Sequence, residues 1–405
     1  MGLGGGGRAG ARAGHGVGVR AAPALVAAVA VAALTGCAVP AIDSSSASCA
    51  TTTVAGLVPT NGVHVGVNLD WGQQLLADYS VQLGRRPAVT VSFTDFPLAP
   101  DDERNMDDAV DQIAAEGGML LLTLEPREGL ATVTDGVAAA LASRLDGYNC
   151  RGVPVIVRFA HEMNGSWYPW GQQPDDYVAA FRRLAAAVHA GAPGSAMMWA
   201  PNYGGGYPFT GGRHGAVPGS IDAAAIDTDG DGVPTGADDP YAPYWPGDDA
   251  VDWVGMSLYH WGDAHPWGEN EVPEPGKFVA QLTGEYGGLG GDDRAVPDFY
   301  GIYGEQHGKP VAIPETAALF APGHGGADEL TVKQAWWRQV FAADVPGQLP
   351  RLAMINWFEW DKEEPEIGGH IDWTATSDPA IRAAYRSDLP EWALWATPPR
   401  TAPPA

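Results

Sequence analysis

Residues 153–171, VPVIVRFAHEMNGSWYPWG, join an apolar run to an unusual concentration of polar and aromatic side chains. The run ends at His161 and Glu162, and the loop that follows carries Trp167 and Trp170. A buried carboxyl group is costly unless it is paired or used in chemistry, so a strand does not need one for its own stability. The stretch therefore predicts a strand that presents functional residues at its carboxyl end.

Apolar runs of this kind recur along the chain, and amphipathic segments such as residues 103–118 and 174–191 lie between most of them. Apolar strands without polar alternation are typical of a parallel sheet covered on both faces. The pattern predicts the α/β class and a single (β/α)8 TIM barrel with loop insertions over residues 61–396. A doubly wound sheet is the alternative, but no Gly-rich phosphate turn follows the first run. The predicted strands are residues 63–69, 88–96, 118–126, 153–162, 196–202, 251–261, 310–316 and 351–360.

Polar or aromatic residues stand at the ends of these runs, and a barrel gathers such ends on one face. Glu162 and Glu315 end the fourth and seventh runs, where they could lie about 5 Å apart, as in a retaining glycosidase. The alternative is a structural pair of carboxylates bonded to Arg158 or to backbone amides. The residues at the run ends are Asp70, Asp95, Glu125, His161, Glu162, Asn202, Tyr259, Glu315 and Trp357.

Two stretches resemble a known family. Residues 157–171 resemble the signature around the acid/base of glycoside hydrolase family 26, and residues 308–317, GKPVAIPETA, resemble its nucleophile strand. The runs AMMWAPN, VDWVGMSLYHWG and INWFEWDKEE also follow in the expected order. The resemblance implies a (β/α)8 barrel and endo-β-1,4-mannanase activity, with Glu162 as acid/base and Glu315 as nucleophile.

The resemblance also implies roles for the neighbours of this pair. His161 would lie beside the sugar, Tyr259 would hydrogen-bond the nucleophile, and Trp357 would form the floor of the −1 subsite. Indoles stack on the apolar faces of sugar rings, so Trp167, Trp170 and Trp261 are further substrate-binding candidates, together with Asn202. We expect no cofactor for catalysis.

The formal charge of −26 argues against nucleic acid and against an anionic membrane surface as partners. The expected partner is a β-glycan polysaccharide, and the expected state is a monomer. A β-1,3-1,4-glucanase or a β-1,3-xylanase remains possible on the same scaffold. A non-catalytic glycan-binding lipoprotein is the alternative from another class, although sugar binding alone would not require both glutamates.

Residues 227–238, DTDGDGVPTGAD, fit the spacing of a calcium loop. Asp227, Asp229, Asp231 and Asp238 take positions 1, 3, 5 and 12, and Val233 would offer its carbonyl at position 7. Flanking helices are missing, so the segment is not an EF-hand. A structural calcium ion is the prediction, and a solvated acidic loop is the alternative.

Residues 1–36 predict a lipoprotein signal peptide, since a basic region and a short apolar stretch end in LTGC. This motif resembles the lipobox of bacterial lipoproteins, which implies lipidation of Cys37 and export to the outer side of the cell membrane. An ordinary secretory peptide is the alternative. Residues 37–60 predict a flexible tether and residues 397–405 a disordered tail. In an exported protein Cys49 and Cys150 predict a disulfide, with two unpaired thiols as the alternative.

Overall fold

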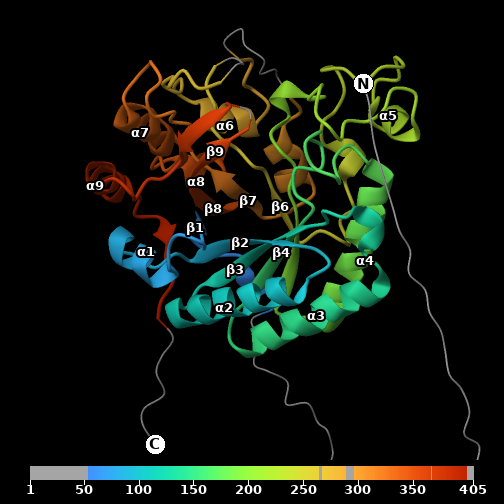
Figure 1. Ribbon diagram of the computed structural model, residues 1–405, viewed down its shortest axis with the longest axis horizontal. Coiled ribbons are helices and arrows are strands. Elements are labelled where there is room, and N and C mark those ends of the chain that lie inside the picture. The colour runs from blue at the N-terminus through green and yellow to red at the C-terminus, as the bar shows by residue number, and fades with distance from the viewer. Residues whose placement is uncertain (1–52, 264–266, 289–295, 366, 399–405) are drawn as a thin grey trace, which may run out of the picture. The chain divides into compact units, whose positions relative to one another are not determined.

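Eight parallel strands, β1 to β8, close into a barrel, because β1 pairs with β2 on one side and with β8 on the other (Figure 1). The predicted (β/α)8 class is therefore confirmed. The strands are β1 Val63–Leu69, β2 Val89–Asp95, β3 Met119–Glu125, β4 Val155–Phe159, β5 Ser195–Trp199, β6 Trp253–Gly255, β7 Val311–Thr316 and β8 Leu352–Glu359.

Helices cover the outside of the strands, and α2, α3 and α4 line one flank of the barrel (Figure 1). Local sequence fixes their ends. Helix α2 begins with Pro100, whose missing N–H costs nothing at a first helical position, and it ends at Gly117 with a left-handed φ of 84°. The helices are α1 Leu76–Leu83, α2 Pro100–Glu116, α3 Asp135–Cys150, α4 Pro174–Gly191, α5 Ile221–Ile226, α6 Lys277–Leu282, α7 Glu329–Val340, α8 Val345–Gln348 and α9 Pro379–Asp388, with a further wide helical turn at Tyr300–Gln306.

Alternate residues of each strand face the barrel interior. Ile156, Met198 and Met354 pack together there, whereas Phe159 faces the helix layer and stacks on Tyr177 of α4. Leu57 is 1% exposed and packs into the same interior cluster from the short turn Val54–Leu57. The predicted tether is therefore too long by several residues, because an apolar side chain on its last part is needed to fill the barrel.

The chain after β8 returns over the barrel before it ends. Strands β9 (Asp361–Glu364) and β10 (Gly369–Asp372) form an antiparallel hairpin, and α9 follows. The final strand β11 (Ala393–Leu394) runs parallel to β1 and extends the sheet. The hairpin thus joins β8 to the last helix.

The computed structural model describes residues 53–263, 267–288, 296–365 and 367–398. Cys37 and Cys49 lie outside these residues, so the lipid anchor and the Cys49–Cys150 pairing stay predictions. Cys150 does take part in a disulfide. Within the described residues, no helix has both the length and the apolar character that crossing a membrane requires.

Candidate active site

The chain turns sharply where β4 ends, and this turn points Glu162 toward the barrel mouth. Ala160 and Glu162 both have left-handed backbones, with φ of 46° and 55°. Such conformations cost free energy for residues other than glycine, and they persist where the surroundings hold them in place. The N–H of Glu162 donates to the carbonyl of Ala200 at 2.9 Å. The unfavourable backbone conformations of Ala160 and Glu162 therefore indicate that the surrounding fold holds His161 and Glu162 in place.

Glu315, in β7, is held by groups from β4 and from the segment that follows β6. The buried guanidinium of Arg158 in β4 donates to Oε1 of Glu315, and it also donates to Oγ of Ser257 at 2.6 Å. The phenol of Tyr259 donates to Oε2 of Glu315 at 2.7 Å. Hydrogen bonds from a cation and a hydroxyl hold a carboxyl group in one orientation. Both carboxylate oxygens are thereby oriented, and a pair of structural carboxylates would share this feature.

Glu162 lies opposite Glu315 across the barrel mouth. An oxygen of each carboxyl group and a ring nitrogen of His161 all lie within 4.8 Å of one another. Burial, and next the negative charge of Glu315, raise the pKa of Glu162 to about 7. The indole N–H of Trp167 donates to Oε2 of Glu162 at 3.0 Å. The site therefore contains one carboxyl group that can carry a proton near neutral pH beside another that is held by Arg158.

His161 is neutral in this surrounding. The ring is 1% exposed, and Nδ1 has no hydrogen-bond partner within the described residues. Burial, followed by the positive charges of Arg158 and Arg127, holds the pKa of His161 well below its usual range. Phe93 and Tyr168 pack against the ring at centroid distances of 5.5 and 4.9 Å. A neutral imidazole in the site suits hydrogen bonding to a hydroxyl group.

Trp167 and Trp261 are half-buried aromatic side chains at the mouth. Trp167 packs edge-on against Phe209 at 5.0 Å, and Trp261 packs against Tyr259 at 6.2 Å. Asn202, at the end of β5, is half-buried, and its backbone is bonded in both directions to the side-chain amide of Asn164. The structure thus brings Trp167, Trp261 and Asn202 to the same face as the glutamates.

The predicted substrate contacts of Trp170 and Trp357 are wrong, because both fully buried indoles pack against aromatic rings of the protein. Trp170 stacks under Tyr168 at 4.5 Å, and its N–H donates to the carbonyl of His161 at 2.7 Å. Trp357 faces the helix layer and packs against Tyr385 at 5.4 Å. Both indoles therefore pack beneath the residues of the site and do not line it.

Phe358 and Trp360 occupy the side of β8 that faces the site. Their rings stack at 5.7 Å, and Phe358 also packs edge-on against Tyr259 at 5.7 Å. The N–H of Trp360 donates to Oδ1 of Asn68 in β1 at 3.2 Å. Side chains alternate along a strand, so residues 356, 358 and 360 lie on the same side as the inward-facing Met354. This alternation could have identified Phe358 and Trp360 as site residues from the sequence.

A second group of charges at the mouth was not assigned a role from the sequence. Arg127 donates to Oε2 of Glu125 at 2.7 Å and lies 3.3 Å from the carboxylate of Asp95. Its guanidinium carbon lies 5.9 Å from the ring centroid of Tyr168 and 5.8 Å from that of Trp170. Burial raises the pKa of Glu125, although the charge of Arg127 opposes the shift. Arg127, which Glu125 and Asp95 hold, thus packs against Tyr168 and Trp170, the two aromatic rings that contact His161.

The acidic loop gathers three of its four predicted carboxylates. Asp227, Asp229 and Asp231 each place an oxygen within 4.8 Å of the others, and Val233 is exposed. Asp238 is not in this group. It is 4% exposed, and its carboxylate accepts backbone N–H groups from Thr228, Asp229 and Thr235 at 2.6, 3.1 and 2.6 Å. Its oxygens shape the loop, so Asp238 lies apart from the three gathered carboxylates, and its part in a calcium site stays a prediction.

Fold and site define a (β/α)8 barrel with a pair of glutamates at the carboxyl ends of strands four and seven. Residues 122–191, which include Glu162, match the family model of glycosyl hydrolase family 26. Endoglucanase H of Acetivibrio thermocellus is 24% identical over 312 residues, which are 73% of this chain and 28% of that protein. The chain thus spans under a third of that curated relative. The matches confirm the resemblance to glycoside hydrolase family 26.

Solved structures share the fold. A modular endo-β-1,4-mannanase from Cellulomonas fimi has a TM-score of 0.53 at 16% identity, over 85% of this chain and 74% of that one. A protein described as GH26C from Muricauda sp. MAR_2010_75 has a TM-score of 0.52 at 14% identity, over 83% and 87%. A broad-specificity endoglucanase from Clostrdium longisporum has a TM-score of 0.53 at 11% identity, over 84% and 98%. At these identities the likeness concerns the barrel.

Proposed function

We propose that this protein is a retaining endo-acting glycoside hydrolase that cleaves β-1,4-mannan-type polysaccharide. The observation that carries the proposal is the approach of the Glu162 and Glu315 carboxyl oxygens to within 4.8 Å. In retaining enzymes the two carboxyl groups lie about 5–5.5 Å apart, whereas inverting enzymes leave about 6.5–9.5 Å for a water molecule. The short separation favours direct attack by one carboxylate.

The first step uses the two glutamates in different protonation states. An oxygen of Glu315 attacks the anomeric carbon, the glycosidic C–O bond breaks, and the leaving oxygen takes the proton of Glu162. The pKa of Glu162, raised to about 7, keeps this proton available near neutral pH. Arg158 and Tyr259 hold Glu315 ready for attack. In the second step water attacks the same carbon and gives a proton to Glu162 as the ester bond to Glu315 breaks.

The aromatic mouth supports a sugar polymer as substrate. Indole faces on Trp167 and Trp261 can stack on pyranose rings, and the neutral His161 can hydrogen-bond a hydroxyl. The Cellulomonas fimi structure is that of a β-1,4-mannanase, and this favours mannan. The curated relative carries the name endoglucanase, and this favours a mixed-linkage β-glucan as the second candidate.

A substrate panel tests the proposal. Release of reducing sugar should be measured on mannan, glucomannan, lichenan and β-1,3-xylan, with size analysis of the products. Endo action on mannan should give a rapid fall in polymer length before short oligosaccharides accumulate. Preference for lichenan would select the second candidate. No hydrolysis of any of the four polymers, by a protein that still binds them, would instead select the non-catalytic glycan-binding alternative.

We propose in addition that the acidic loop holds a structural calcium ion. Asp227, Asp229 and Asp231 offer hard oxygen ligands within one small space, which suits calcium. The carbonyl of Val233 would complete the set on the exposed side. The ion would stabilise the loop between β5 and β6 and would take no part in the reaction.

We also propose that the mature chain is anchored to the outer side of the cell membrane through a lipid on Cys37. The LTGC motif supports this location, and Cys37 lies outside the described residues. In the native host, a Cys37→Ser variant should leave the membrane fraction and appear in soluble form. An unchanged distribution of the variant would contradict the anchor.

A further inference from the structure

Trp373 lies directly behind the phenol that contacts Glu315. Its indole ring is 5.2 Å from the ring of Tyr259, at an interplanar angle of 61°, and 5.0 Å from that of Trp261. Trp373 is only 1% exposed, so it does not present a face to a sugar. Edge-to-face contacts between aromatic rings depend on orientation. The direction of the Tyr259 phenol therefore depends on where Trp373 lies.

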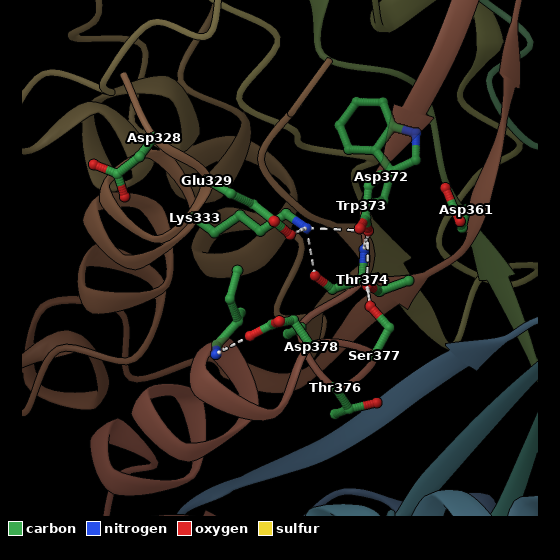
Figure 2. A network of polar contacts seen from close by, with 12 residues as sticks. Asp328, Glu329, Lys333, Asp361, Asp372, Trp373, Thr374, Thr376, Ser377 and Asp378 are labelled. Atoms are coloured by element: carbon green, nitrogen blue, oxygen red, sulfur yellow. Dashed lines mark hydrogen bonds and ion pairs between the residues drawn. The ribbon is translucent and has the colours of Figure 1, made fainter. Parts of the chain in front are cut away.

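Buried Lys333 bonds the residues on both sides of Trp373 (Figure 2). Its ammonium group donates to Oε1 of Glu329 at 2.6 Å, to Oδ1 of Asp372 at 3.1 Å and to the carbonyl of Thr374 at 2.6 Å. An ammonium group has three donors, and all three are used here. Helix α7 is thereby tied to the residues that precede and follow Trp373.

Two buried glutamates, Glu359 and Glu364, hold the same segment. Oε1 of Glu364 in β9 accepts the indole N–H of Trp373 at 2.8 Å. The carboxylate of Glu359, at the end of β8, accepts the backbone N–H groups of Ala375 and Thr376 at 3.0 and 2.7 Å. The indole is thus fixed at its N–H, and its backbone is fixed on both sides. A side chain that only fills the core does not need hydrogen bonds to its ring and to the backbone around it.

We propose that Trp373 is a positioning residue that holds the phenol of Tyr259 on Glu315. This inference rests on the proposed function, in which Glu315 attacks the sugar. Trp373 acts through Tyr259 and does not touch the reacting atoms. A displacement of about 1 Å in a catalytic group can lower a rate about 100-fold. Loss of the indole edge would leave the phenol free to turn away from Oε2 of Glu315, with a loss in the chemical step.

A double-mutant cycle tests the coupling. Trp373→Phe, Tyr259→Phe and the double variant are compared by kcat and KM on the β-glycan that the wild type hydrolyses. We expect Trp373→Phe to lower kcat about tenfold with little change in KM, since a small displacement of the phenol is enough. In the Tyr259→Phe background the same change should cost less than about twofold, because coupled residues are not additive. Trp373→Ala should lower kcat further than Trp373→Phe.

Trp337→Phe is the matched control. Trp337 is another fully buried indole whose N–H donates to a carboxylate, that of Asp388, and it packs against Tyr385 in the helix layer. The control should lose stability and keep kcat. If Trp373→Phe lowers kcat by the same factor with and without the Tyr259 hydroxyl, the inference is overturned and the proposed function stands. The same conclusion holds if the kcat of Trp373→Phe is no lower than that of Trp337→Phe. A wild-type protein that hydrolyses no β-glycan would overturn the proposed function and this inference with it.

Discussion

Carboxyl oxygens of Glu162 and Glu315 lie within 4.8 Å of each other, although the two residues come from strands on different sides of the barrel. Two negative charges at this distance repel, so one of the two groups retains a proton more readily. Arg158 and Tyr259 contact Glu315, whereas Glu162 receives an indole N–H from Trp167. The two carboxyl groups therefore have different hydrogen-bond partners, and this difference is the basis of the separate roles proposed for them.

The first prediction concerns the pH dependence of the rate. Since the pKa of Glu162 is raised to about 7, kcat/KM should fall as the pH rises above about 7, where the acid loses its proton. The N–H of Trp167 stabilises the charged form, so Trp167→Phe should raise the pKa further and move the basic limb to higher pH. Initial rates from pH 4 to 10 measure both limbs. A flat profile up to pH 9 in the wild type would contradict the role of Glu162.

The second prediction follows from the same pKa but concerns stability. The folded-state value of about 7 lies above the ordinary value of 4.5, so the charged form destabilises the fold as the pH rises through this window. Glu162→Gln should therefore increase the free energy of unfolding at pH 8, by on the order of 1–3 kcal/mol, with little effect at pH 4. Urea unfolding at both pH values measures this. The control is Glu305→Gln, at an exposed glutamate. Its effect on the free energy of unfolding should be the same at pH 8 and at pH 4.

The third prediction concerns Lys333. Its removal leaves Glu329 and Asp372 without their buried cation, and breaking one side of a buried ion pair typically costs about 3–5 kcal/mol. Lys333→Met should lower the free energy of unfolding by about this amount. Arg182→Met removes the exposed partner of Asp249 and should cost much less, because solvent screens an exposed ion pair. Similar losses in the two variants would show that the Lys333 network adds little.

The fourth prediction separates calcium binding from loop structure. Added calcium should raise the melting temperature of the wild type in proportion to the logarithm of its concentration above the dissociation constant, and a chelator should reverse the effect. Asp229→Ala should abolish this dependence. Asp238→Ala should lower the melting temperature and keep some calcium response, because its carboxylate bonds backbone amides of the loop. A wild-type melting temperature unaffected by millimolar calcium would count against the site.

Sequence reasoning reached the barrel because its strands are apolar runs and its polar residues stand at their ends. The same logic placed Glu162, Glu315 and Tyr259 on one face, where they are found. It went wrong at Trp357, because side chains alternate along β8 and a shift of one residue exchanges the core for the site. The neighbouring Phe358 lies on the site side.

Other features could not be read from local patterns. Trp170 is buried because the loop after β4 folds back under Tyr168, and that path depends on contacts with distant residues. Trp373 reaches Tyr259 only because the β9–β10 hairpin returns over the barrel. The residues of the calcium motif were placed by spacing alone, which does not show that Asp238 lies apart from the other three carboxylates. These are tertiary contacts, and periodicity carries no information about them.

The fifth prediction assigns opposite roles to the two glutamates. Glu162→Ala should lose most activity on polymer, whose leaving alcohol needs a proton, and much less on an aryl glycoside with a good leaving group. The glycosyl-enzyme should then accumulate, and azide should speed its turnover to a β-glycosyl azide. Glu315→Ala should be inactive on both substrates, and azide rescue should give the α-product, because azide replaces the nucleophile.

The stereochemistry of the wild-type reaction decides whether this assignment can stand. Double displacement inverts the anomeric carbon twice, so newly released reducing ends should be β when the reaction is followed by proton NMR before mutarotation. Tyr259→Phe should slow the reaction without changing the anomer, since the phenol orients Glu315 and does not replace it. If the α-anomer appears first, water attacks the sugar directly and Glu315 acts as a base. Both roles would then have to be reassigned.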